Sequence, residues 1–288
     1  MSRPRSAARL RRSASFRRLT GISTAAFDRV IEQRRGSWGQ TQRRKRKPGR
    51  PREIGGLEDH LLVLLPHHRC CVTQEVIGFF HPVDRSVICR AIRRIEAPVT
   101  RLFGIRRVPR IERAAAEALI IDCTEQPIQR PRDDASQRAH HSGKKKRQTL
   151  KTEYVVPADG RIAGVSPSHP GSHHDLTIRR TGPPLPKGAR AHVDSAYQGC
   201  DKEPPTLDFP HQKPKGGELT SEEKEHNRAL SSFRVGVEHR IGRTKRFRIA
   251  GERFRIAGER FRNPLATHHA KASIVAGPVN IEAGFWPF

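Results

Sequence analysis

Three acidic side chains stand where they could serve one reaction. Asp122 and Asp194 close short apolar runs, in LIIDCTEQPIQRP and ARAHVDSAYQG, and Glu238 lies in SSFRVGVEHRIGRTK. Cleaving or forming a phosphodiester requires charge to be neutralised on the attacking and leaving oxygens. Two Mg²⁺ ions about 3.5–4 Å apart do this when a small cluster of carboxylates holds them. The three acids are therefore candidates for a two-metal site of phosphoryl transfer, although each acid alone is more often structural than catalytic.

Short strands and one helix must bring these acids together. An acid directly after apolar β-forming residues is expected at the carboxyl end of a buried strand, where α/β proteins place their sites. Asp159-Gly160 predicts a hairpin. The predicted elements are strands at 118–122, 149–156, 161–167 and 189–194 and a helix at 230–247. This order is typical of an α/β sheet with an antiparallel edge.

The predicted helix carries charged residues on one face. Arg234, Glu238 and Lys245 fall at i, i+4 and i+11, so two cations flank the carboxylate. An ordinary salt-bridged surface has the same pattern, and the spacing alone leaves both interpretations open.

The charge of the chain indicates a polyanionic partner. Its 288 residues include 56 Lys and Arg against 29 Asp and Glu, a net charge of +27 at pH 7, and residues 1–56 hold 17 of the cations but 3 of the acids. Such a surface neutralises phosphates and releases their counterions. Duplex DNA is the expected partner, with RNA coating as the alternative. No apolar run approaches the ~20 residues that span a bilayer, and no secretory signal is evident, so we expect a cytoplasmic protein without a membrane partner.

Residues 1–56 are expected to form a basic arm and linker with one short helix. Residues 1–18 are Arg/Ser-rich and are expected to stay disordered until they meet DNA. The short helix is capped by Ser23 and has an apolar stripe at Ala26, Phe27, Val30 and Ile31. The linker RRKRKPGRPR resembles an AT-hook, in which Arg50 and Arg52 would lie in the minor groove of A·T-rich DNA. A solvated basic linker is an equally good interpretation.

Residues 57–100 are expected to form a DNA-binding domain of three helices. The segment TQEVIGFFHPVDRSVICRAIRRI resembles a helix-turn-helix, with Ile77 and Phe80 packing inward. The N-terminal residues of its last helix would enter the major groove, where Arg pairs with guanine edges. That helix carries Arg85, Ser86 and Arg90, followed by Arg93 and Arg94, which are expected to touch phosphates. The alternative is a structural three-helix cluster with an incidental basic face.

Several blocks resemble those of bacterial insertion-sequence transposases of the DDE-superfamily endonuclease type. They are IDCTEQPIQRP, HSGKKKRQTLKTEYVV, PGSHHDLTIRR, VDSAYQG and RVGVEHRIGRTKRF, and the resemblance runs from about residue 20 to 285. It implies a ribonuclease-H-like mixed sheet at about 114–282, with the small helical domain preceding it. Asp122, Asp194 and Glu238 would then be the catalytic, metal-binding triad.

The same family carries a Tyr-two-Arg-three-Glu-six-Lys signature around its glutamate. Arg234, Glu238 and Lys245 match the spacing, and the resemblance implies that the two cations hold DNA phosphates. Ser231 stands at the tyrosine position, so that part of the signature is absent.

The resemblance implies a DNA transposase that cuts the ends of its insertion sequence. Two Mg²⁺ ions, for which Mn²⁺ can substitute, would support water attack, and the freed 3′-hydroxyls would then attack target DNA. The implied partners are the duplex DNA of the terminal inverted repeats and the target. Joining two ends implies a homodimer or a larger assembly.

Some features compete with this interpretation. Two further acids are candidate metal ligands: Glu125, and Asp175, which follows two histidines in GSHHD. Asp175 could instead hydrogen-bond to a residue that binds the metal and so fix its orientation. Pro66 and Pro278 fall inside predicted helices, and FRIAGER at 247–253 is repeated at 254–260. These features suggest decay, so the alternative function is a catalytically defective copy that only binds DNA.

Overall fold

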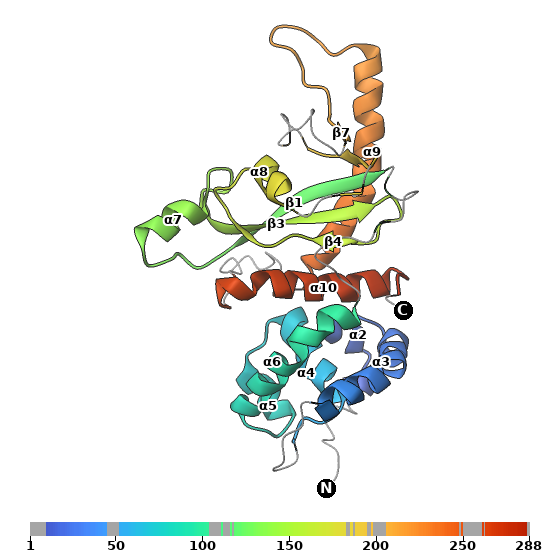
Figure 1. Ribbon diagram of the computed structural model, residues 1–288, viewed down its shortest axis with the longest axis vertical. Helices are drawn as coiled ribbons and strands as arrows, with labels where there is room; N and C mark the ends of the chain where they lie inside the picture. Colours follow the sequence, from blue (N-terminus) through green and yellow to red (C-terminus); the bar gives the residue numbers. More distant parts are fainter. Residues whose placement is uncertain are drawn as a thin grey trace.

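The protein has two parts with one helix between them. The structure, a computed structural model, describes residues 10–44, 52–103, 118–182, 188–194, 206–247 and 263–286 and positions 111, 116, 185, 186, 197, 249 and 261. A bundle of N-terminal helices lies on one side of α10 (His268–Glu282), and a sheet with its own helices lies on the other (Figure 1). No helix within these described residues is long and apolar enough to cross a membrane.

Capped, amphipathic helices build the N-terminal part. They are α2 (Phe16–Thr20), α3 (Thr24–Arg44), α4 (Leu57–Cys70), α5 (Gln74–Phe80) and α6 (Arg85–Leu102). The Thr73 side chain accepts a hydrogen bond from the Val76 backbone N–H, and Asp84 Oδ1 accepts one from Ser86 at 2.7 Å. The predicted starts of α5 and α6 are thus confirmed, because each cap satisfies an N–H group that the first turn leaves unpaired.

The N-terminal segment is more ordered than we predicted. The predicted short helix is a 21-residue α3, and its stripe at Ala26, Phe27, Val30 and Ile31 is buried as expected. Helix α2 begins within the segment expected to be disordered, and Phe16 there is 2% exposed. Both helices pack on α4, so their apolar side chains bury enough surface to offset the loss of chain entropy. The AT-hook core with Arg50 lies outside the described residues.

Phe80 does not pack inward, which corrects our prediction. Its side chain is 58% exposed and that of Phe79 is 82% exposed, whereas Ile77 is buried as expected. The buried position one turn after Ile77 is His81. Between them Gly78 touches the backbone of the next turn, where a Cβ would come within 2.6 Å. This short helix therefore buries Ile77, Gly78 and His81 and leaves both phenylalanines in solvent.

A mixed sheet forms the other part, as the sequence predicts. The strand order is β2-β3-β1-β6-β7, with β4 and β5 also paired to β3. Strand β1 is antiparallel to β3 and parallel to β6, which is parallel to β7. The strands are β1 (Leu119–Pro127), β2 (His141–Ser142), β3 (Arg147–Pro157), β4 (Gly164–Val165), β5 (His169–Pro170), β6 (Arg190–His192) and β7 (Thr206–Asp208).

The helices of this part are α7 (Asp134–His140), α8 (Asp175–Thr181), α9 (Ser221–Thr244), the 3₁₀ turn η3 (Leu265–Thr267) and α10. Helix α9 begins nine residues before the predicted start. Thr220 and Glu223 form a reciprocal capping box there, with hydrogen bonds of 2.8 and 3.2 Å. The Thr-x-x-Glu spacing is a sequence signal for this start.

The predicted hairpin at Asp159-Gly160 is confirmed. The Gly160 backbone has φ +83°, and its N–H donates to the Pro157 carbonyl at 2.8 Å. Asp159 Oδ1 accepts from the Arg161 N–H at 2.7 Å. The turn joins β3 to β4, although β4 is shorter than the predicted strand.

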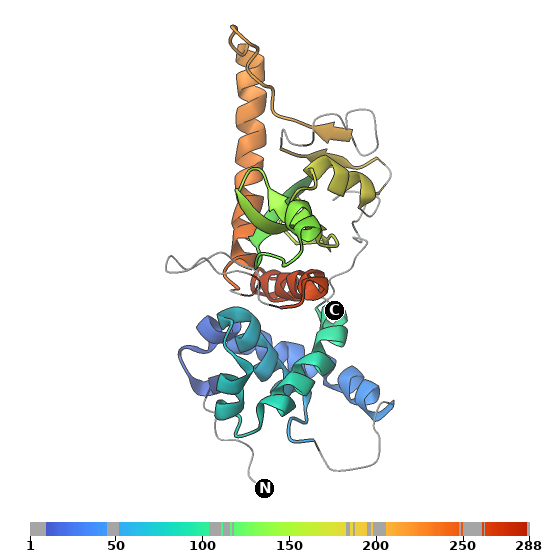
Figure 2. The same cartoon turned by 90° about the vertical axis from the view of Figure 1, so that its left-hand side faces the viewer.

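Each face of the sheet packs into its own core, because side chains alternate along a strand. Ile120, Tyr154 and Val156 belong to the core that includes α10, whereas Leu119 and Val155 belong to the opposite one. Helix α8 lies over the opposite face (Figures 1 and 2). The face on which a polar residue lies can therefore be read from its position in the register.

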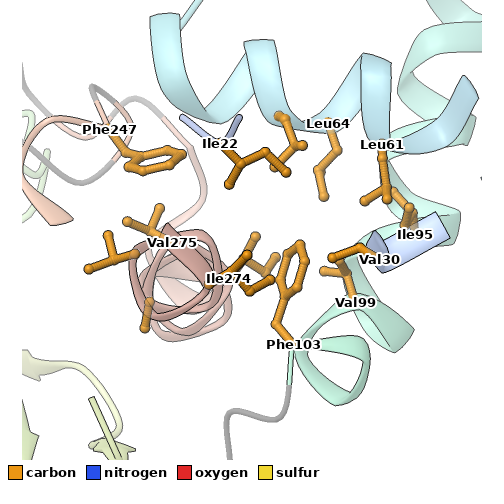
Figure 3. Close-up of a cluster of buried hydrophobic side chains, with 14 of the residues drawn as sticks. Ile22, Val30, Leu61, Leu64, Ile95, Val99, Phe103, Phe247, Ile274 and Val275 are labelled. Carbon is orange, nitrogen blue, oxygen red and sulfur yellow. The ribbon is translucent and has the colours of Figure 1, made fainter. Parts of the chain in front are cut away.

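Helix α10 joins the two parts through one continuous core. Ile274 and Val275 contact the cluster that contains Leu64 of α4 and Phe103 after α6 (Figure 3). Gly277 allows this approach, because a Cβ there would lie 2.3 Å from the Phe103 Cβ. Lys271 and Glu96, both largely buried, add an ion pair at 2.5 Å. Prolines 66 and 278 lie inside α4 and α10, and neither helix ends at its proline.

A buried ion pair fastens α8 to the sheet. Arg179 Nη1 lies 2.5 Å from Glu153 Oε1 of β3, and their side chains are 6% and 1% exposed. Burial raises the pKa of Glu153 from 4.5 to about 7, and Arg179 opposes this rise.

Alanine substitutions at two helical glycines should have opposite effects on the free energy of unfolding. Gly277→Ala should lower the free energy of unfolding by about 1–3 kcal/mol, because the new Cβ clashes with Phe103. Gly242→Ala in α9 should raise it by up to about 1 kcal/mol, because the space there is open. Urea unfolding measures both. A Gly277→Ala protein as stable as the parent would contradict the close approach of α10.

Removing Arg179 should destabilise the protein in a pH-dependent way. Arg179→Met leaves a buried carboxylate unpaired and should cost roughly 3–5 kcal/mol near pH 8. At pH 5 the loss should be smaller, because Glu153 can take a proton in the folded state, where its pKa exceeds the unfolded value. Chemical unfolding of parent and variant at both pH values measures this, and an equal loss at both would contradict it.

Candidate active site

The strand register brings Asp122 and Asp194 together. Parallel strands β1 and β6 pair at Leu119↔Ala191 and Ile120↔His192. Two residues beyond this pair are Asp122, within β1, and Asp194, which lies just past the end of β6 and not within the strand as predicted. Side chains alternate along an extended chain, so both acids are expected on the face of Ile120 and His192. Adjacent strands lie about 4.8 Å apart, so the two carboxylates lie on neighbouring backbones.

Asp122 lies within its strand, not at its end as predicted. Antiparallel pairing with β3 continues five residues beyond Asp122, to Pro127↔Thr149. The recorded parallel pairing with β6 stops at Ile120. Asp122 therefore lies two residues beyond Ile120↔His192, the last pair between β1 and β6. Asp194 follows β6, so it lies next to this edge of β1.

Helix α9 covers the same face. Tyr154, the antiparallel partner of Asp122, belongs to the same buried cluster as Ile241 of α9, and Thr244 of α9 acts on the Tyr154 hydroxyl. The His192 ring meets the Phe233 ring edge-to-face, with centroids 5.0 Å apart. The segment of α9 between these two contacts carries Glu238.

The charged face of α9 is turned toward these acids. Arg234 Nη2 lies 3.9 Å from Glu238 Oε1, and the Arg234 side chain is only 17% exposed while that of Glu238 is 57% exposed. Lys245 follows the helix at its C-terminal cap and is exposed. The two cations predicted to flank the glutamate are therefore near the acids, with Arg234 partly enclosed.

The pKa of Asp122 shows that these charges act on one another. Burial raises this pKa above its ordinary value. Arg234 and Lys245 oppose the rise, and Glu238 and Asp194 add to it. All four predicted partners therefore contribute to the field at Asp122.

The carboxylates suit a hard divalent cation chemically, although they are not gathered around one. Among the described residues, Asp122 is a half-buried carboxylate without a hydrogen bond or ion pair of its own. An oxygen ligand of this kind is what Mg²⁺ binds in proteins. The described part of the chain contains no group of three His, Cys, Asp or Glu side chains placed to hold a metal ion.

The competing acids lie on the opposite face. Glu125 is three residues after Asp122 in the same strand and pairs with Lys151 of β3. Lys151 Nζ lies 2.8 Å from Asp175 Oδ1 and 3.7 Å from Glu125 Oε1. Thr149 Oγ1 donates a further hydrogen bond to Glu125 at 3.0 Å. Both acids are thus engaged in an ion-pair cluster on the side of α8.

The residues predicted to contact DNA differ in how accessible they are. Those exposed on α6 are Arg85, Ser86, Arg90 and Arg93. Arg94 instead turns toward α4, where its Nη1 lies 3.3 Å from His60 Nε2, and burial lowers its pKa. Arg52 donates to Gln42 Oε1 at 2.6 Å.

The sequence did not predict a polar cluster beside the site. Asp208 of β7 accepts hydrogen bonds from His192 of β6 and His226 of α9. The weak signal for it was His192, two residues before Asp194 in the same apolar run. Asp208 and His226 lie in segments for which the sequence predicts no helix or strand.

Neutralising Asp122 should stabilise the metal-free protein. Its folded pKa is raised, so the carboxyl favours the folded state only below that pKa, and stability falls as pH rises through the window above the ordinary value. Asp122→Asn should therefore raise the melting temperature at pH 8 more than at pH 4. Glu238→Gln, at a mostly exposed position, should change the free energy of unfolding by less than about 0.5 kcal/mol. A lower melting temperature for Asp122→Asn at pH 8 would contradict this.

Comparison with known proteins identifies a family for this chain. Residues 121–275, more than half of the chain, match the family described as DDE superfamily endonuclease. The chain is also 29% identical, over 273 residues that cover 93% of it and 94% of the relative, to a Microchaete diplosiphon protein described as "Probable transposase for insertion sequence element IS702". No solved structure matches significantly. The matched region contains the three acids, and the chain belongs to the DDE superfamily endonuclease family.

Proposed function

We propose that the protein is a DNA transposase that cuts the ends of an insertion sequence and joins the resulting 3′-hydroxyls to target DNA. The observation that carries this proposal is the placement of Asp122 beside Asp194 under the charged face of α9. The family match and the transposase description of the relative support the same reaction. The sheet that holds the acids is proposed to be ribonuclease-H-like.

Asp122, Asp194 and Glu238 are the proposed ligands of two Mg²⁺ ions, or of Mn²⁺ in their place. When bound, such ions neutralise charge on the attacking and leaving oxygens of a phosphodiester. Asp122 offers a half-buried carboxylate, and its partial removal from water strengthens its attraction for a cation. Glu238 must leave its long contact with Arg234 to join them, and Arg234 and Lys245 are then available to hold DNA phosphates.

Helices α4 to α6 are proposed to bind the terminal inverted repeats as a helix-turn-helix. Support comes from the exposed basic side chains of α6 and from a net charge of +27. Arg85, Ser86 and Arg90 are the proposed base contacts and Arg93 a phosphate contact. Arg94 can reach a phosphate only by leaving His60. Synapsis of two ends is proposed to need at least a homodimer.

The triad can be tested by cleavage of a labelled terminal-repeat duplex with and without Mg²⁺. Asp122→Asn, Asp194→Asn and Glu238→Gln should each lower the cleavage rate by at least about 100-fold, since each removes a charge that stabilises the transition state. Binding of the same duplex in a gel shift should be retained.

Asp175→Asn is the matched control, because it removes a carboxylate from the other face of the sheet. It should leave cleavage within about tenfold of the parent. Full cleavage by Asp194→Asn would show that the second ligand is misassigned. Binding by the parent without cleavage under either metal would establish the alternative, a catalytically defective copy.

A further inference from the structure

A single carboxylate connects two strands to the helix that carries Glu238. Asp208 Oδ2 accepts from His192 Nδ1 at 3.0 Å, and Asp208 Oδ1 accepts from His226 Nε2 at 3.0 Å. The two rings come from β6 and α9, and Asp208 ends β7. Each oxygen serves one ring, so the carboxylate bridges the sheet edge and the helix.

This bridge lies directly beside the proposed active site. His192 is the last residue of β6 and lies two residues before Asp194, and its ring also packs on Phe233, the neighbour of Arg234. His226 lies twelve residues before Glu238, about 18 Å along the same helix. His192 is therefore linked through the chain to Asp194, and His226 is linked through α9 to Glu238.

Helix α9 needs a contact of this kind because much of it projects beyond the sheet (Figures 1 and 2). Its C-terminal half is fixed by Ile241 in the core and by Thr244 at Tyr154. The described side chains from Ser221 to Ala229 are exposed or half-buried, and Leu230 is the first buried one. A helix held mainly at one end can turn about that end, and a 1 Å shift of a catalytic group can cost about 100-fold in rate.

We propose that the His192–Asp208–His226 bridge positions α9 so that Arg234 and Glu238 meet Asp194. The inference rests on the proposed function, because it takes Glu238 and Asp194 as the ligands that must meet. The bridge residues are 23%, 38% and 35% exposed. Contacts that open to solvent add little global stability, so the effect of the bridge is on position.

The ring nitrogens that the bridge uses allow a matched test. His226 donates through Nε2, and the side-chain nitrogen of glutamine occupies that position, whereas the nitrogen of asparagine corresponds to Nδ1. His226→Gln therefore keeps the hydrogen bond to Asp208, and His226→Asn loses it. Both variants remove the ring contact with His211 equally.

Two measurements are made on each variant. Hydrogen–deuterium exchange over residues 221–233 of the metal-free full-length protein reports how firmly α9 is held. Mg²⁺-dependent cleavage of the labelled duplex reports kcat and KM. His226→Asn and Asp208→Ala should speed exchange and lower kcat about 10- to 100-fold with KM for DNA nearly unchanged. His226→Gln should restore both exchange and kcat.

Asn227→Ala is the control on the same helix. Asn227 makes two hydrogen bonds with the His211 backbone, at 2.8 and 2.9 Å, and these join α9 to the preceding loop without reaching β6 or β7. This variant should leave kcat unchanged.

Three results would overturn the inference. The first is unchanged hydrogen–deuterium exchange in His226→Asn, and the second is unchanged kcat in the same variant. The third is a His226→Gln protein that is as impaired as His226→Asn, which would assign the effect to loss of the ring. Failure of the proposed function is a different result, in which the parent does not cleave; the exchange measurement, made without metal or DNA, still decides whether the bridge holds α9.

Discussion

The docking of α9 on one face of the sheet is the constraint on which the site depends. Asp122 and Asp194 are placed by backbone pairing, which fixes their faces as soon as β1 and β6 are in register. Glu238 and its two cations reach them only through side-chain contacts of α9 with that face. The geometry of the site is therefore rigid on the strand side and adjustable on the helix side.

The cluster of acids around Asp122 lowers the stability of the folded protein, and burial elsewhere in the fold must offset this loss. Burial and two neighbouring acids disfavour the charged form of Asp122, and Arg234 and Lys245 only partly offset them. Such a cluster of like charges weakens a folded protein unless a cation binds it, which is the usual conflict between stability and function at an active site. The shared core around α10 supplies the apolar burial that tolerates it.

The sequence predicted the elements whose signals are local. The caps Thr73 and Asp84, the Asp159-Gly160 turn and the stripe on α3 are all present, because each depends on residues within a few positions. The assignment of Asp122, Asp194 and Glu238 to one site comes only from the family resemblance, and it stays a prediction. The sequence prediction failed where packing decides: Phe16 is ordered by its contacts with α4, and Phe80 is exposed because Ile77, Gly78 and His81 form the buried face of α5. The Asp208 bridge joins three elements, and no spacing along the chain encodes it.

Helix α10 determines how the two parts act together. It follows the catalytic helix in sequence, yet its apolar side chains share a core with α4 and α6 as well as with the sheet. The Lys271–Glu96 ion pair is buried in that junction, and Gly277 lies so close to Phe103 that no side chain fits between them. Packed cores shift between discrete arrangements and do not deform continuously. Because one core connects the two parts, the placement of the basic face of α6 relative to the acids at β1 and β6 depends on the packing of α10.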